Sequence, residues 1–183
     1  MAGVGGSVVE VFDFVWARFS ARISGLEDDE YYWEPVAGCW SLREDESGEL
    51  RLDGAGGGGP PPDPVPITTI AWRLGHIGDL VLANFALRAR NLPESEVPDQ
   101  PARASGVTSY LADCYGLWRE WLTTMPEERW TENLGPDWGP YGESSWLDLA
   151  LHVLDELAHH GAEVGVLRDL YSQRQSLVDR ATD

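Results

Sequence analysis

The stretch that decides the fold is Trp146–Leu170, WLDLALHVLDELAHHGAEVGVLRDL. At about 100° per residue its apolar side chains gather on one side of a helix. This apolar stripe consists of Trp146, Ala150, Val153, Leu157, Val164 and Leu167. His160 lies inside the stripe, where a leucine would be expected, and Glu156 lies about 70° from its centre. The pattern predicts a helix from Ser144 or Ser145 to about Gln173, with His160 buried and Glu156 half-buried.

Three other segments repeat apolar residues at helical spacing and are expected to pack against this helix. The first runs from Ser7, as the N-cap, to about Leu26, and the second from about Thr68 to Arg90. The third runs from about Ser105 to Thr124, and Pro126 ends it. The sequence therefore predicts an all-α four-helix bundle.

Residues 28–66, between the first two helices, have a different composition. Cys39–Arg43 and Glu49–Asp53 flank the turn sequence Asp45-Glu46-Ser47-Gly48, which predicts a short hairpin. Gly54–Pro66 contains GGGG and PPP runs and is expected to be a flexible linker without regular structure. A chain of 183 residues fits one domain, residues 1–183, into which this hairpin and linker are inserted.

The net charge of the chain argues against some classes of binding partner. The formal net charge is −18, and all 13 basic residues are arginine. So acidic a surface repels phosphate backbones and anionic lipid, which argues against nucleic acid and membrane surfaces as partners. No apolar run approaches the roughly 18 residues of a membrane span. Met1–Gly6 has no basic residue, so we expect no signal peptide and a cytoplasmic protein.

The two cysteines, Cys39 and Cys114, lie in unrelated segments and show no CxxC spacing. We expect two separate, buried, reduced thiols, with a disulfide or a reactive thiol as the less favoured alternatives.

Glu156 and His160 form the chemically most informative pair. A carboxylate and an imidazole in an apolar stripe need a partner, because burying them unpaired costs several kcal/mol. Residues four apart on a helix lie about 5–6 Å from each other, so the two side chains can chelate one metal ion. The alternative is a core histidine that is simply hydrogen-bonded to a neighbouring glutamate. His76 is the one histidine outside the last helix, and helical angles leave open which way it points.

The remaining polar and aromatic candidates carry weaker signals. His152 and His159 lie more than about 100° from the stripe and are expected at the surface, where His159 and Glu163 form an ordinary helical pair. His152 could instead donate a hydrogen bond to a metal ligand. Trp33 and Trp40 either line a substrate mouth or cap one end of the bundle, and the capping role is the favoured one.

Three strings carry a family resemblance: WRLGHIGD at residues 72–79, DELAHHGAEVGVLRDLY at 155–171 and YYWEPVAGCWSLR at 31–43. They resemble the DinB/YfiT-like superfamily of metal-binding bundles, the last string an actinobacterial subgroup of it. The resemblance implies an up-down-down-up helix order, with His76, Glu156 and His160 as metal ligands. Glu156 stands where many members have a histidine, and the related mycothiol-dependent maleylpyruvate isomerases resemble this His, Glu and His arrangement.

Three ligands on two helices would leave coordination positions open, which is typical of a catalytic site. Two histidines and one carboxylate suit zinc, nickel, iron and manganese alike, so the ligand types do not decide the metal; zinc is the first expectation. Such an ion would lower the pKa of a bound thiol or water. The resemblance implies a small-thiol S-transferase or isomerase that uses mycothiol and an electrophilic substrate, and it also implies a homodimer. The competing hypothesis is a non-catalytic bundle that binds a metal or another ligand and whose ion is structural.

Overall fold

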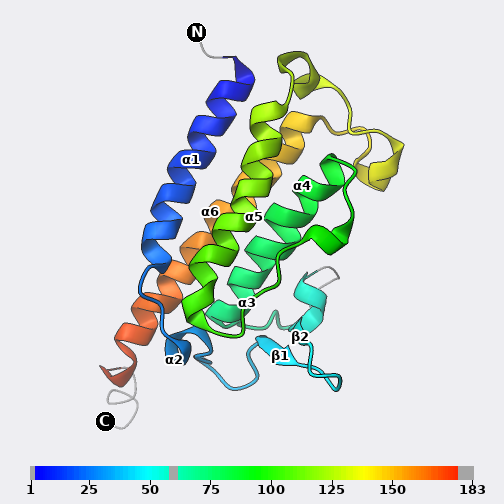
Figure 1. Ribbon diagram of the computed structural model, residues 1–183. Coiled ribbons are helices and arrows are strands. Elements are labelled where there is room, and N and C mark those ends of the chain that lie inside the picture. Colours follow the sequence, from blue (N-terminus) through cyan, green and yellow to red (C-terminus); the bar gives the residue numbers. More distant parts are fainter. Residues whose placement is uncertain (1–2, 58–61, 177–183) are drawn as a thin grey trace.

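The computed structural model describes residues 3–57 and 62–176, and in this part of the chain four long helices pack side by side (Figure 1). Three of them are α1 (Val4–Ile23), α5 (Ala104–Thr124) and α6 (Trp146–Ser172). The fourth consists of three consecutive segments: α3 (Ile70–Gly75), η2 (His76–Ala83) and α4 (Asn84–Ala89). The predicted all-α four-helix bundle is confirmed.

The direction of the helices follows the order that the family resemblance implied. α1 and α6 run one way, whereas α5 and the α3–α4 helix run the other way (Figure 1). Residues 90–103, which include the short turn η3 (Glu94–Glu96), lead back along the bundle, so that α5 starts at the same end as α3. Residues 125–145, with η4 (Glu127–Thr131) and η5 (Pro136–Tyr141), connect α5 to α6.

The core contains the apolar stripes that the sequence predicts. All six members of the α6 stripe are buried, and Val153, Leu157 and Val164 are fully so. Burying each such side chain contributes about 1.5–3 kcal/mol before the cost of ordering the chain. Indole rings close the end of the bundle near η4: Trp121 lies 4.6 Å from Trp118 and 5.7 Å from Trp146, measured between ring centroids. No helix within residues 3–57 and 62–176 is both long enough and apolar enough to cross a membrane.

The helices α6 and α1 are capped in different ways: α6 by residues next to it in the sequence, and α1 by a residue far away in the sequence. The Ser145 hydroxyl accepts a hydrogen bond from the Asp148 amide, and the Asp148 carboxylate accepts one from the Ser145 amide, so Ser145 caps α6 and the predicted start of this helix is confirmed. The predicted start of α1 at Ser7 is wrong, because the helix already begins at Val4. The Glu127 carboxylate, from the α5–α6 connection, accepts hydrogen bonds from the first amides of α1, and local sequence cannot reveal a cap so distant in the chain.

The insertion between α1 and α3 folds onto the bundle at the start of α3. After α2 (Asp28–Tyr31), the strands β1 (Leu42–Glu44) and β2 (Leu50–Leu52) pair antiparallel, Leu42 opposite Leu52, which confirms the predicted hairpin in shorter form. Trp40 binds the chain just before α3 through two backbone hydrogen bonds, donating to Ile67 O (2.9 Å) and accepting from Thr69 N (2.8 Å).

The expectation that Gly54–Pro66 lacks regular structure is wrong for its first residues, because Asp53–Gly57 forms the 3₁₀ turn η1. Residues 58–61 of the expected linker lie outside the described part of the chain. Cys39 and Cys114 are separate, buried free thiols, as predicted.

A buried ion pair fastens the insertion to α6. Arg168 donates two hydrogen bonds to the Glu30 carboxylate, at 2.8 and 3.0 Å, and one to Ser24 O at 2.9 Å. The side chains of Glu30 and Arg168 are only 9% and 16% exposed. The pair therefore fixes α2 against the last turns of α6.

Replacing Glu30 by alanine should lower the free energy of unfolding by about 3 kcal/mol, because it leaves the Arg168 charge buried without its partner. Urea denaturation measures the loss. Arg51→Ala is the control: it breaks two ion pairs at the surface, with Asp45 and Glu49, and should change stability by less than about 0.5 kcal/mol. Equal effects of the two substitutions would contradict the role assigned to the buried pair.

Candidate metal centre

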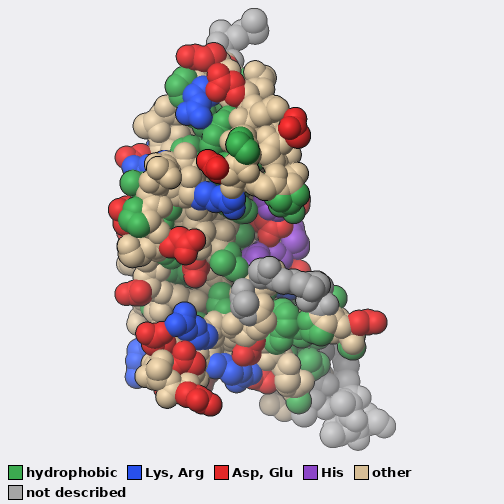
Figure 2. Space-filling view, turned by 90° about the vertical axis from the view of Figure 1, so that its right-hand side faces the viewer, with side chains coloured by type: hydrophobic (Ala, Val, Ile, Leu, Met, Phe, Trp, Pro, Cys, Tyr) green, Lys and Arg blue, Asp and Glu red, His purple; other side chains and the backbone are tan. Residues whose placement is uncertain are grey.

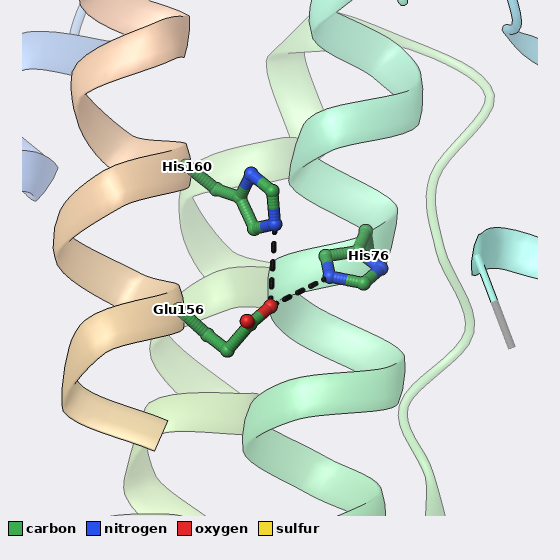
Figure 3. Close-up of side chains that lie close together, drawn as sticks. All are labelled: His76, Glu156 and His160. Carbon is green, nitrogen blue, oxygen red and sulfur yellow. Dashed lines mark hydrogen bonds and ion pairs between the residues drawn. The ribbon is translucent and has the colours of Figure 1, made fainter. Parts of the chain in front are cut away.

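Three side chains from two helices converge on one point in the seam between η2 and α6 (Figure 3). Glu156 Oε2 lies 3.1 Å from His76 Nε2 and 3.2 Å from His160 Nε2. A ligand atom from each residue lies within 4.8 Å of those of the other two. The two imidazole rings meet nearly at right angles, 87°, with centroids 4.7 Å apart. The structure thus brings together the three residues that the sequence analysis named as ligands.

The α6 half of this cluster follows from helical geometry. Glu156 and His160 are one turn apart and point to the same side of α6. The side chain of His160 is 10% exposed and that of Glu156 is 19% exposed. The predicted burial of His160 and half-burial of Glu156 are both confirmed.

His76 occupies the position where the second helix stops being a regular α-helix. The π-helical segment η2 starts at this residue, and its i→i+5 hydrogen bonds accommodate more residues per turn than an α-helix does. Angles of 100° per residue therefore do not hold beyond His76, and the apolar residues on more than one side of this helix also left the orientation of His76 open. Its side chain, 14% exposed, turns toward α6.

The second nitrogen of each imidazole is already bound to an acceptor. His76 Nδ1 lies 2.7 Å from Gly56 O, and His160 Nδ1 lies 2.6 Å from Glu163 Oε2. A carbonyl and a carboxylate only accept hydrogen bonds, so both rings donate through Nδ1–H. In the neutral rings, Nε2 then carries a lone pair, and both lone pairs face the Glu156 carboxylate. Three electron-rich atoms that converge in this way fit a cation between them.

Arg73 forms an ion pair with Glu163, the residue that accepts the hydrogen bond of His160. Its Nε lies 2.9 Å from Glu163 Oε2, and its Nη1 lies 3.1 Å from His160 Nδ1. Because a guanidinium only donates, the nearer Glu163 carboxylate takes the His160 hydrogen bond, and Arg73 pairs with that carboxylate. Sequence reasoning missed this role of Glu163, although it follows His160 by three residues on the same helix face.

The protonation states suit metal binding. Burial lowers the pKa of His160, and the positive charge of Arg73 lowers it further, against the opposing effect of Glu163. Burial alone would raise the pKa of Glu156, but its close contacts with His76 and His160 outweigh burial and leave this pKa lowered. A neutral imidazole and an ionised carboxylate are the forms that bind a metal.

Two other groups of side chains have suitable spacing but fit an ion less well. One joins His159 and Glu163 to His160, yet the Arg73 guanidinium contacts the same Glu163 and would repel a cation there. The other joins Asp155 and His159 to Glu156, and its members are exposed apart from Glu156. The seam between η2 and α6 is therefore the best candidate centre.

The aromatic candidates lie at different distances from the centre. Trp72 stacks on His76 at 5.2 Å between ring centroids, and Trp40 packs against Trp72 at 5.7 Å. Trp33 packs instead against Tyr171, which lies about 16 Å along α6 from His160 at 1.5 Å per residue. Trp40 is thus one ring removed from His76, whereas Trp33 packs at the far end of α6.

The remaining histidines are at the surface, as predicted. His152 is exposed and packs its ring against Phe85, 5.8 Å away between centroids. His159 is 49% exposed and lies 3.9 Å from Glu163. In the described part of the chain no hydrogen bond joins His152 to His76, Glu156 or His160, and its alternative role as a hydrogen-bond donor to a metal ligand stays a prediction.

Comparison with known families gives the context of this centre. The family model of the DinB superfamily matches residues 12–164. The chain belongs to the DinB superfamily. The match includes His76, Glu156 and His160, and superfamily members commonly bind divalent metals. No curated protein and no solved structure matches the chain.

Replacing Glu156 by glutamine should weaken zinc binding by more than about 100-fold and leave the fold intact. Glutamine has almost the same volume but no charge, and losing a direct ligand should cost more than the roughly 10- to 100-fold cost of losing an outer partner. Isothermal titration with zinc and elemental analysis measure the loss.

Asp155→Asn is the matched control, since it removes one exposed charge from the neighbouring position of α6. It should leave zinc affinity within about twofold of the native value, as expected for a screened surface charge. A larger effect of Asp155→Asn than of Glu156→Gln would place the ion in the exposed group of Asp155, Glu156 and His159.

Proposed function

We propose that this DinB superfamily protein is a metal-dependent enzyme in which His76, Glu156 and His160 hold one divalent ion for thiol transfer or isomerisation. One observation carries the proposal: both imidazole Nε2 atoms and the Glu156 carboxylate converge, while both Nδ1 atoms are engaged elsewhere. A divalent cation satisfies all three ligand atoms at once. The donor set of two nitrogens and one oxygen suits zinc first, and it also accommodates nickel, iron or manganese.

Access from solvent favours catalysis over a purely structural ion. Each of the three side chains retains 10–19% of its exposure. Histidine and acidic side chains lie side by side on one face of the molecule (Figure 2). Three protein ligands leave at least one coordination position for an exchangeable molecule, whereas closed structural zinc sites use four protein ligands.

The bound ion would lower the pKa of a coordinated thiol or water and so supply a nucleophile near neutral pH. The chain's own residues keep the ligands ready for this: Glu163 and Gly56 hold the two imidazoles, and Glu156 contributes one negative charge. Burial raises the pKa of Cys39, and it raises the pKa of Cys114 to about 12, so neither is a ready nucleophile. The thiol would therefore come from a small molecule such as mycothiol, and an electrophile would be the second substrate.

The competing function is a bundle whose ion serves only stability. The core supports the catalytic role, because buried apolar side chains from all four long helices form one cluster that can stabilise the bundle. A metal that is not needed for folding is available for chemistry.

Removing the metal should lower the melting temperature and leave cooperative unfolding in place. An ion present at 100 times its dissociation constant adds about 2.7 kcal/mol, which corresponds to roughly 5–10 °C for a chain of this size. Calorimetry with and without a chelator measures the shift. Unfolding of the chelated protein at room temperature would favour the structural ion.

The catalytic proposal is tested by incubating the zinc-loaded protein with mycothiol and a set of electrophiles such as epoxides, alkyl halides and maleylpyruvate. Product formation should require the metal, should fall below detection in Glu156→Gln and should persist in Asp155→Asn. A turnover rate that is the same with and without metal would contradict the proposal.

A further inference from the structure

We propose that the η1 turn, Asp53–Gly57, is a positioning element for His76 and fixes that imidazole in its metal-binding orientation. The inference rests on the proposed metal site and concerns what holds one of its ligands in place. The Gly56 carbonyl accepts the Nδ1–H hydrogen bond of His76 at 2.7 Å. The turn belongs to the insertion between α1 and α3, so a segment outside the four long helices completes the centre.

The glycines of this turn are required by its backbone and its neighbours. Gly54, Gly56 and Gly57 have φ values of +62°, +65° and +92°, in the region that disfavours other residues. A Cβ on Gly56 would lie 2.6 Å from the Leu80 side chain, and one on Gly54 would lie 2.4 Å from the Trp40 ring. The chain therefore passes close beneath Trp40 and beside the helix that carries His76.

The turn that carries the Gly56 carbonyl is anchored at its first residue, Asp53, to the hairpin and to α3. The Asp53 carboxylate accepts hydrogen bonds from Ser41 N at 2.8 Å and Arg43 Nε at 3.0 Å, which tie the turn to the hairpin. The Asp53 carbonyl accepts a hydrogen bond from Trp72 Nε1 at 2.8 Å, which ties it to α3. The same Trp72 ring stacks on His76 with an interplanar angle of 6°.

These contacts decide which nitrogen of His76 faces the metal. A carbonyl can only accept, so Nδ1 keeps its hydrogen and Nε2 presents a lone pair toward Glu156. Ligating histidines usually donate their other N–H to a carbonyl or a carboxylate, which fixes the ring orientation and the tautomer. Here His160 uses the Glu163 carboxylate and His76 uses the Gly56 carbonyl, so the two ligands have different outer partners.

The test compares two glycine substitutions that both strain the backbone. Gly56→Ala adds a methyl group beside Leu80 at φ +65°, whereas Gly48→Ala adds one at φ +85° in the hairpin turn, where no heavy atom lies within 4 Å. Titration with zinc should show binding about 10- to 100-fold weaker in Gly56→Ala and unchanged in Gly48→Ala. Equal zinc affinity in the two variants would overturn the inference.

A second variant is available if Gly56→Ala does not fold, and a second measurement is made without metal. Asp53→Ala retains all the glycines but removes the anchor to the hairpin, and it too should weaken zinc binding; it replaces Gly56→Ala if that variant does not fold. In the metal-free native protein, nitrogen NMR of the imidazoles should show His76 with its hydrogen on Nδ1. In the variants, the population of this tautomer should fall.

An unchanged tautomer in both Gly56→Ala and Asp53→Ala would overturn the positioning role. Native protein that binds no zinc would instead overturn the proposed function, and the tautomer measurement would still decide what the turn does.

Discussion

The structure of the candidate centre depends on one electrostatic constraint: the Glu156 carboxylate lies between two imidazole nitrogens in a half-buried seam. Such groups are costly to bury unless each has a partner. Half of this cost is offset by acceptors for the two Nδ1–H groups: Glu163 of α6 for His160 and Gly56 of the η1 turn for His76. The remaining cost comes from the three electron-rich atoms that face one another, and a divalent cation between them would remove it. Three features meet at this site: the ligands are partly buried, the insertion holds His76, and the π-helical segment η2 starts at His76.

Much of the bundle could be predicted from sequence because its information is local. The stripe along α6, the cap at Ser145 and the extent of α5 all depend on residues within a few positions of one another. The start of α1 could not be predicted, because the residue that caps it, Glu127, belongs to the α5–α6 connection and is distant in the sequence. The structure of the glycines after Asp53 could not be predicted for the same reason. Their composition is typical of a linker, but their position against Trp40 depends on tertiary packing.

The candidate site, too, could be predicted only in part from the sequence. Glu156 and His160 share one helix, so the spacing alone placed them together. His76 lies where η2 departs from α-helical geometry, and its direction became clear only with the structure. Arg73, Glu163 and Gly56 act on the ligands through contacts that no spacing rule covers, apart from the i, i+3 relation of His160 and Glu163. The family resemblance supplied the link to His76 that the angles left open.

The proposed function requires one ion in the seam between η2 and α6, with one coordination position open for a small molecule. Anomalous diffraction at the zinc edge from crystals of the zinc-loaded protein tests this most directly. One peak is expected about 2.0–2.3 Å from His76 Nε2, His160 Nε2 and a Glu156 oxygen, with a non-protein ligand completing the coordination. A peak on His159 and Glu163 instead, or a fourth protein ligand that closes the site, would contradict it.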